Sequence, residues 1–164
     1  DDRALFSLTM AKIESIFATV FRQISMYLFE RELHQARRST GELTTAQINH
    51  LWRTQQTKLY GNSVKLGEQC DLWWSYIPHF LHNPFYVYAY AFGELLTLAL
   101  YAQYERTPEG FADRYLNMLA TGGSLAPKDL LAPFNINLEG AQFWQGGINV
   151  IEDLVATAMK LKAK

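Results

Sequence analysis

Apolar residues recur at steps of three and four over the first 38 residues, which is the repeat of a helix with one buried face. Ile13, Ile16, Val20 and Ile24 fall on that face. Further apolar residues lie on a second face of the same helix: Phe6, Met10, Phe21, Phe29 and Leu33. The pattern therefore predicts one long, central helix over about 4–38, covered from more than one side.

Capping signals define the next helix. Gly41 favours a helix end, and Thr44 and Gln47 have the spacing of a capping box at a helix start. We expect a second helix from there to about residue 60. A loop or short helix should follow up to Pro78, because proline disfavours helix at the residue before it.

The second half of the chain carries further helix signals. Asn83 followed by Pro84 favours a helix start, and the helix should run to about residue 105. Thr107 and Pro108 repeat this signal, and Gly122 should end the helix that follows. The remaining expected elements are a short helical turn at 127–131, a loop at 133–138 and a final amphipathic helix over about 140–161.

The pattern predicts an all-α protein with about five main helices and short helical turns. No segment alternates apolar and polar residues over a useful length, as a half-buried strand would. At 164 residues, 49% of them hydrophobic, the chain can build one sizeable core and is too short for two ordinary domains. We therefore expect a single helical domain over residues 1–164.

Composition narrows the expected partners and location. Fifteen Lys and Arg against sixteen Asp and Glu give a net charge of -1, so no strong field attracts nucleic acid, and we expect none. No run of about 18 uncharged apolar residues is present, so we expect no membrane partner. The single cysteine, Cys70, cannot form an internal disulfide, which favours a reducing, cytoplasmic location.

The segment 77–90 concentrates hydrogen-bond donors. His79 stands just before the predicted helix start, while Tyr86 and Tyr90, four residues apart, share a helical face from which Tyr88 points away. Phenol and imidazole groups can donate to a developing oxyanion, as a peptide-cleaving site requires. The alternative is that these tyrosines lie at the edge of the core with their hydroxyls at its rim.

The chain lacks the usual spacing of zinc ligands. It has no H-E-x-x-H, which sets two imidazoles on one helical turn with a general-base Glu between them. Glu30 and His34 are four residues apart and are expected to form a surface pair, because one pair falls short of the three protein ligands of a catalytic zinc site. His50 and His82 are expected to be solvated or capping residues. We therefore predict no metal site in this chain.

Several segments agree in order and spacing with one known family. They are 77–80 (Ile-Pro-His-Phe) and 84–90 (Pro-Phe-Tyr-Val-Tyr-Ala-Tyr), together with 19–23, 29–34, 41–44, 60–61, 122–124 and Pro127. These segments resemble the carboxyl-terminal part of the oligoendopeptidase F family, in the thimet-oligopeptidase-like superfamily, and they cover nearly the whole chain. Three positions depart from the family pattern: Leu81 replaces a common Tyr, Phe92 a small polar residue, and Asn135 a usual Gly.

The resemblance implies the carboxyl-terminal lobe of a zinc metallopeptidase that cuts short peptides in a channel between mostly helical halves. In that family two His of H-E-x-x-H and a later Glu hold the metal, upstream of anything that matches this chain. Zinc is therefore expected in the complete enzyme and not in this chain. The resemblance also assigns to His79, Tyr86 and Tyr90 hydrogen bonds to the substrate and to the oxyanion, with Tyr88 ranked lower.

The leading hypothesis is a substrate-binding lobe of a zinc metalloendopeptidase, inactive as an isolated chain. Its expected partners are an oligopeptide substrate and the missing amino-terminal catalytic segment. Apolar surface left bare without that segment can also drive homo-oligomer formation. The alternative is a non-catalytic helical domain that binds peptide or protein, and a third reading is a helical bundle that holds haem or metal through His.

Overall fold

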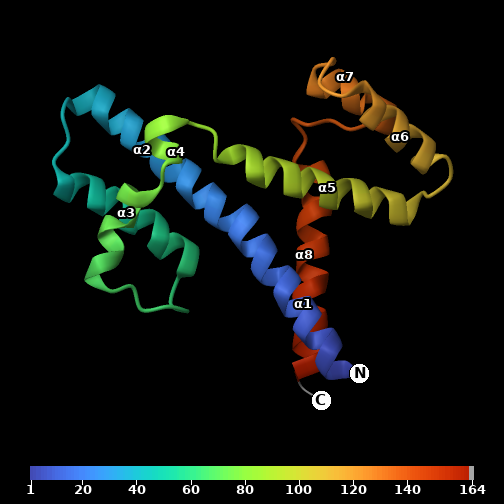
Figure 1. Ribbon diagram of the computed structural model, residues 1–164, viewed down its shortest axis with the longest axis horizontal. Coiled ribbons are helices and arrows are strands. Elements are labelled where there is room, and N and C mark those ends of the chain that lie inside the picture. Colours follow the sequence, from blue (N-terminus) through green and yellow to red (C-terminus); the bar gives the residue numbers. More distant parts are fainter. Residues whose placement is uncertain (163–164) are drawn as a thin grey trace. The chain divides into compact units, whose positions relative to one another are not determined.

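The computed structural model describes residues 1–162, and this part of the chain is helical with no strand (Figure 1). The prediction of an all-α fold is confirmed. Residues 163 and 164, which the single-domain prediction includes, lie outside the described residues. The elements in chain order are α1 (Asp2–Ile16), the π-helical turn η1 (Phe17–Phe21), α2 (Arg22–Thr40), α3 (Thr45–Tyr60), the 3-10 helix η2 (Glu68–Tyr76), α4 (His79–His82), α5 (Tyr88–Arg106), α6 (Phe111–Thr121), α7 (Pro127–Leu131), the 3-10 helix η3 (Ala132–Phe134) and α8 (Ala141–Lys162).

The long first helix is confirmed, with a π-helical turn inside it. Helices α1 and α2 continue one another through η1, from Asp2 to Thr40. Phe29 is fully buried in α2, as expected of a covered helix. In α1, however, Leu8 is 70% exposed and Met10 is 42% exposed. The prediction of cover from more than one side is therefore wrong for α1, because an apolar period shows which faces favour burial and not whether anything packs on them.

The same helical run, Asp2–Thr40, is the one stretch within residues 1–162 that is long and apolar enough to cross a membrane by length and composition. Core helices of soluble proteins and signal sequences meet the same test, so this is weak evidence for a membrane segment. The run also carries charge, since Lys12 pairs with Glu94 of α5 at 3.0 Å. The expectation of no membrane partner stays a prediction.

The capping box before α3 is present as the sequence indicates. The amide of Gln47 donates to the Thr44 hydroxyl at 3.3 Å, and the amide of Thr44 donates to Gln47 Oε1 at 2.8 Å. The helix ends before Gly61, whose φ of 52° is favourable only without a side chain. Local capping chemistry thus fixes both ends of α3.

Two other helices begin later than their signals suggest. Helix α5 begins at Tyr88, because Asn83 and Pro84 belong to a turn and Phe85 has a φ of 60°, outside the helical range. Helix α6 begins at Phe111, after a left-handed Gly110 with a φ of 62°. The prediction of a helix start at Asn83 is therefore wrong by about one helical turn.

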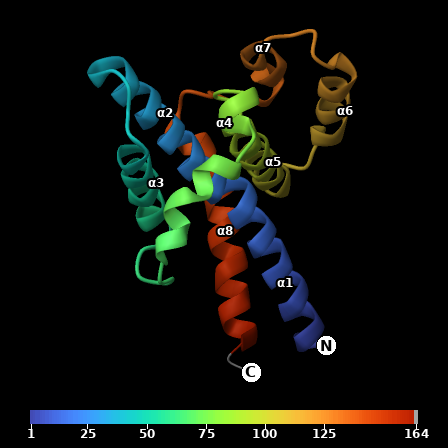
Figure 2. The ribbon, with the colours of Figure 1, turned by 60° about the vertical axis from the view of Figure 1, so that its left-hand side comes forward.

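The chain divides into two compact units, Glu14–Phe92 and a second unit formed by Asp1–Ile13 with Gly93–Lys164. In the unit Glu14–Phe92, α2 and α3 lie side by side (Figures 1 and 2). The core of this unit is formed by Met26, Phe29, Trp52, Ile77 and Val87. The core of the other unit is formed by Leu100, Phe111, Leu131 and Phe134. A single domain over 1–164 stays a prediction.

Candidate functional site

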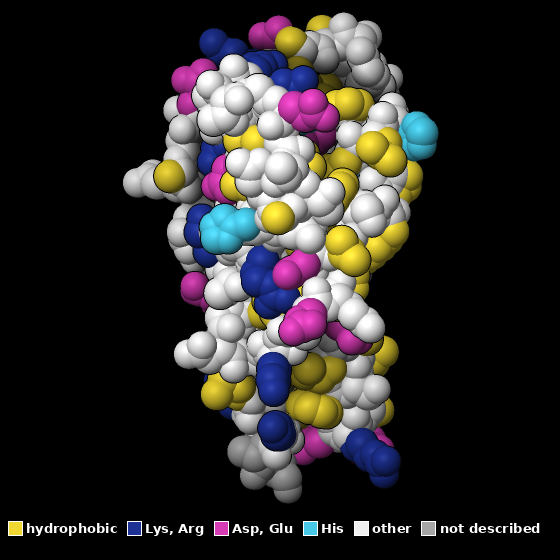
Figure 3. All heavy atoms as spheres, turned by 90° about the vertical axis from the view of Figure 1, so that its left-hand side faces the viewer, with side chains coloured by type: hydrophobic (Ala, Val, Ile, Leu, Met, Phe, Trp, Pro, Cys, Tyr) yellow, Lys and Arg dark blue, Asp and Glu magenta, His cyan; other side chains and the backbone are white. Residues whose placement is uncertain are grey.

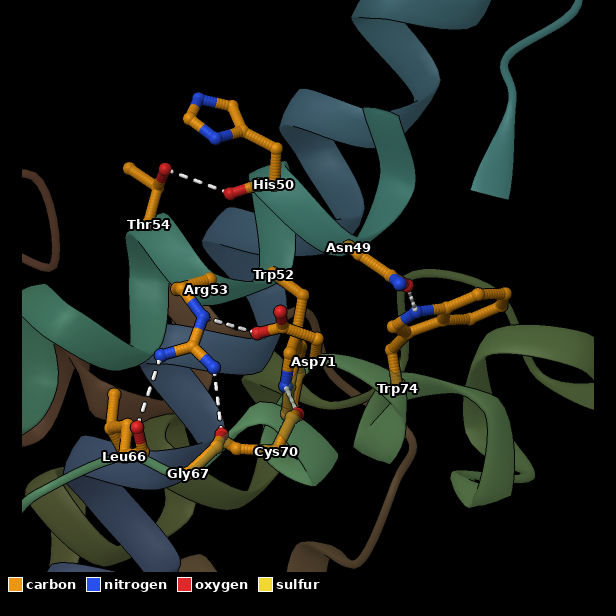
Figure 4. A network of polar contacts seen from close by, with 10 residues as sticks. All are labelled: Asn49, His50, Trp52, Arg53, Thr54, Leu66, Gly67, Cys70, Asp71 and Trp74. Atoms are coloured by element: carbon orange, nitrogen blue, oxygen red, sulfur yellow. Dashed lines mark hydrogen bonds and ion pairs between the residues drawn. The ribbon is translucent and has the colours of Figure 1, made fainter. Parts of the chain in front are cut away.

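An arginine on α3 holds the chain that leads into the segment 77–90. Arg53 donates from Nη2 to the carbonyl oxygen of Gly67 at 2.7 Å and from Nη1 to that of Leu66 at 3.3 Å (Figure 4). Its Nε also forms an ion pair with the carboxylate of Asp71. One planar guanidinium thus fixes two carbonyls and one carboxylate, which a lysine could not do with the same geometry.

Two tryptophan side chains reinforce this attachment. The indole of Trp52, on α3, donates to the carbonyl oxygen of Cys70 at 2.9 Å, and the indole of Trp74, in η2, donates to Asn49 Oδ1 at 2.8 Å. Figure 4 shows both contacts between α3 and the segment that contains η2. Because buried indole N–H groups require an acceptor, these bonds fix the place of η2 against α3.

Two buried residues anchor the ends of the segment 77–87. Ile77 is 5% exposed and Val87 is 1% exposed, and both pack in one cluster with Phe29 and Trp52. The residues between them are mostly exposed. The segment 77–87 is therefore an exposed loop and short helix whose two ends are held in the core.

The structure brings His79, Tyr86 and Tyr90 together. His79 Nε2 lies 3.1 Å from the Tyr90 hydroxyl, and the tautomer of the imidazole decides which of the two donates. The rings of His79 and Tyr86 are parallel within 5°, with centroids 6.1 Å apart. The rings of Tyr86 and Tyr90 are perpendicular, with centroids 5.5 Å apart. The three predicted site residues thus form one cluster.

This cluster is open to solvent. The side chains of Tyr86 and Tyr90 are 51% and 39% exposed, and His79 is partly exposed. The two phenol hydroxyls are hydrogen-bond donors, and the imidazole donates from a nitrogen that carries a proton. All three groups lie within residues 79–90. Such an arrangement can bind a carbonyl oxygen and stabilise the negative charge that develops on it during acyl transfer.

Tyr88 does not join the cluster. Its ring packs edge-on against Tyr27 of α2, with centroids 6.3 Å apart.

Two of the positions that depart from the family pattern can be placed. The side chain of Leu81 is 68% exposed. Asn135 has a φ of 55°, so it does occupy the left-handed conformation expected where the family usually has Gly.

The burial of Glu30 was not predicted from the sequence. It is only 1% exposed, and its Oε1 accepts a hydrogen bond from the amide of Phe85 at 2.7 Å. The expectation of a surface pair with His34 is therefore wrong for Glu30. A signal was present, because Glu30 follows Met26 by four residues and so shares a face with that buried side chain.

The part of the chain that the structure describes offers no ligand set for a metal. No group of three or more His, Cys, Asp and Glu side chains gathers there closely enough to hold an ion. His50 and His82 have exposed side chains, as predicted.

Basic and acidic side chains are interspersed on the face drawn in Figure 3.

Comparison with known proteins gives one family. The family model described as Peptidase family M3 matches residues 1–150. Oligoendopeptidase F of Lactococcus lactis subsp. cremoris is similar in both its plasmid and chromosomal forms, at 29% and 30% identity over all of this chain and 27% of each relative. Oligopeptidase PepF of Bacillus subtilis is 28% identical over 86% of this chain and 21% of its own length. The chain belongs to peptidase family M3.

A solved structure supports this assignment. A crystal structure of a candidate peptidase from Chlamydophila abortus matches 98% of this chain with a TM-score of 0.89 and 26% identity. The match covers 27% of that chain. This chain therefore spans about a quarter of the length of its relatives.

Proposed function

We propose that this chain is the substrate-binding helical lobe of a zinc metalloendopeptidase that hydrolyses short peptides. Membership in peptidase family M3 supports the reaction class, and the relatives bear oligoendopeptidase and oligopeptidase names. The observation that carries the proposal is the exposed cluster of His79, Tyr86 and Tyr90. In this proposal the cluster binds the peptide beside the bond to be cut.

The chemistry required of the cluster is charge stabilisation. As a nucleophile adds to the peptide carbon, the carbonyl oxygen gains negative charge, and donors fixed in advance stabilise that charge without reorganising. The Tyr86 hydroxyl, on a half-exposed side chain, would donate to this oxygen. The hydrogen bond between His79 and Tyr90 would hold the imidazole in one orientation beside it.

Zinc would supply a Lewis acid in the complete enzyme. The described residues of this chain do not fit a zinc site, so the part of the reaction proposed for them is hydrogen bonding to the peptide. We propose that the metal ligands belong to polypeptide outside this chain, which spans about 27% of its oligoendopeptidase relatives. The isolated chain would then bind peptide without cutting it.

A comparison of the isolated chain with the complete enzyme that contains it tests this function. Both are assayed for binding and for hydrolysis of fluorogenic peptides in the presence of zinc. We expect the complete enzyme to cut the peptides and the isolated chain to leave them intact. If the complete protein bound peptides and never cut them, this chain would belong to a non-catalytic binding protein instead.

A further inference from the structure

A strained turn places Tyr86. The amide of Tyr86 donates to the carbonyl oxygen of Asn83 at 3.3 Å, which closes a four-residue turn with Pro84 and Phe85 at its centre. The proline ring keeps φ negative at the second position, whereas Phe85 has a φ of 60° at the third. This combination is a type II turn, whose third position normally requires Gly. A phenylalanine there needs support from its surroundings.

Two side chains of α2 supply that support. Glu30 Oε1 accepts from the amide of Phe85 at 2.7 Å, the length of a charge-assisted hydrogen bond. His34, one helical turn further on, lies with its ring centroid 4.6 Å from that of Phe85. The backbone and the side chain of one strained residue are thus both held by the same helix.

Burial of the Glu30 carboxylate costs free energy of folding. Its Oε2 atom is buried and has no hydrogen-bond partner among residues 1–162, although Oε1 is satisfied. A buried carboxylate with half of its acceptors unused stabilises a fold less than an apolar side chain of similar size would. We therefore look for the role of Glu30 in the turn conformation that it holds, and not in a gain of folding stability.

We infer that Glu30 is a positioning residue for Tyr86, acting through the Phe85 amide to aim the tyrosine hydroxyl at the substrate. This inference rests on the proposed function. Tyr86 directly follows the held amide, and its ring stands parallel to that of His79. Without the carboxylate, the Phe85 peptide is free to turn away from the conformation with a φ of 60°, and the Tyr86 hydroxyl moves with it.

The positioning itself is tested in this chain by NMR. Glu30→Leu should move the Phe85 amide resonance upfield, speed its hydrogen exchange and weaken the nuclear Overhauser contacts between the His79 and Tyr86 rings. Glu30→Gln keeps an oxygen acceptor and should retain those contacts. Ser25→Ala is the matched control, because Ser25 is a buried polar residue of α2 that bonds to α3 and not to the turn. Unchanged ring contacts in Glu30→Leu would overturn the inference.

The consequence for catalysis is tested in the complete enzyme, at a temperature where circular dichroism shows every variant folded. Glu30→Leu should lower kcat by about 10-fold to 10²-fold with little change in KM, because a misplacement of 1 Å can cost that much. Glu30→Gln should keep most of the activity, and Ser25→Ala should keep all of it. An equal loss in Glu30→Leu and Ser25→Ala would show a structural role only.

A double-mutant cycle separates this inference from the proposed function. If Glu30 acts through Tyr86, adding Glu30→Leu to Tyr86→Phe should lower kcat little further, since the hydroxyl it positions is already gone. Losses that multiply in full would overturn the inference. If Tyr86→Phe alone leaves kcat unchanged, the proposed function of Tyr86 fails, and the NMR contacts still decide whether Glu30 holds the turn.

Discussion

Cys70 shows how a single residue is set by its surroundings. It lies in η2, is 2% exposed, and its carbonyl oxygen accepts from the Trp52 indole. Burial raises the pKa of the Cys70 thiol above its ordinary value of 9.0, and this outweighs the lowering effect of the Arg53 guanidinium. The neutral thiol is therefore the form that the fold favours.

A pH series of alkylation by iodoacetamide tests this assignment. Because the thiolate is the reactive form, the reaction rate of the folded chain should rise with its midpoint at a higher pH than that of the urea-unfolded chain. In the interval between the two midpoints the unfolded chain loses its proton first, so stability should fall as pH rises there. A folded midpoint below the unfolded one would contradict the burial argument.

At the residue scale, the sequence indicated the members of the candidate site and missed the residue that supports it. His79, Tyr86 and Tyr90 lie within 12 positions of one another, which allowed the sequence to group them. The expected helical face shared by Tyr86 and Tyr90 is wrong, however, because Tyr86 lies in the turn before α5. Glu30 lies 55 positions from Phe85, and nothing in the local pattern links the two. The periodicity of a sequence does not predict contacts between segments that lie far apart along the chain.

At the element scale, the positive φ of Phe85 explains an incorrect helix start. Asn83 and Pro84 form a normal start signal, yet the turn that they enter has a positive φ at Phe85, and α5 begins only at Tyr88. The start of α3, by contrast, rests on Thr44 and Gln47 alone, which lie three residues apart, and it was predicted correctly. The helix start with a pair of capping side chains was therefore predictable, whereas the starts of α5 and α6, which follow positive φ angles at Phe85 and Gly110, were not.

Gly147 lies where α8 approaches α5. A Cβ atom at Gly147 would lie 2.9 Å from the carbonyl oxygen of Leu95, closer than such atoms normally approach. At the neighbouring Gly146, a Cβ would meet nothing within 4 Å. The two positions therefore form a matched pair within one helix.

Thermal unfolding of two variants tests this packing. Gly147→Ala should lower the free energy of unfolding by about 1–3 kcal/mol, the usual cost of overpacking, and so lower Tm by several degrees. Gly146→Ala should raise it by about 0.5–1 kcal/mol, because alanine favours helix over glycine. Equal shifts of the same sign in both variants would show that α8 does not approach α5 so closely.

At the scale of the whole molecule, large apolar side chains are exposed in both units of the chain. Leu8, Tyr76, Leu81 and Met159 are each 68–70% exposed. The chain spans about 27% of its relatives, and exposed apolar residues that gather into one patch commonly mark places where other polypeptide packs. Homo-oligomer formation through exposed apolar residues, like a cytoplasmic location, stays a prediction.

Metal analysis of the purified chain tests the division of roles between this lobe and the rest of the enzyme. After incubation with zinc and gel filtration, we expect far less than one zinc per chain, because the described residues provide no group of three ligands. The complete enzyme, treated in the same way, should retain zinc. About one tightly bound zinc per isolated chain would place the metal site within this lobe.

The kcat of Tyr86→Phe in the complete enzyme tests the central claim most directly, with Tyr104→Phe, an exposed tyrosine further along α5, as the control. Losing one donor to an oxyanion typically costs about 10²–10³ in kcat. We expect a loss of that order in Tyr86→Phe with KM little changed, and none in Tyr104→Phe. Near-normal turnover of Tyr86→Phe would contradict the account.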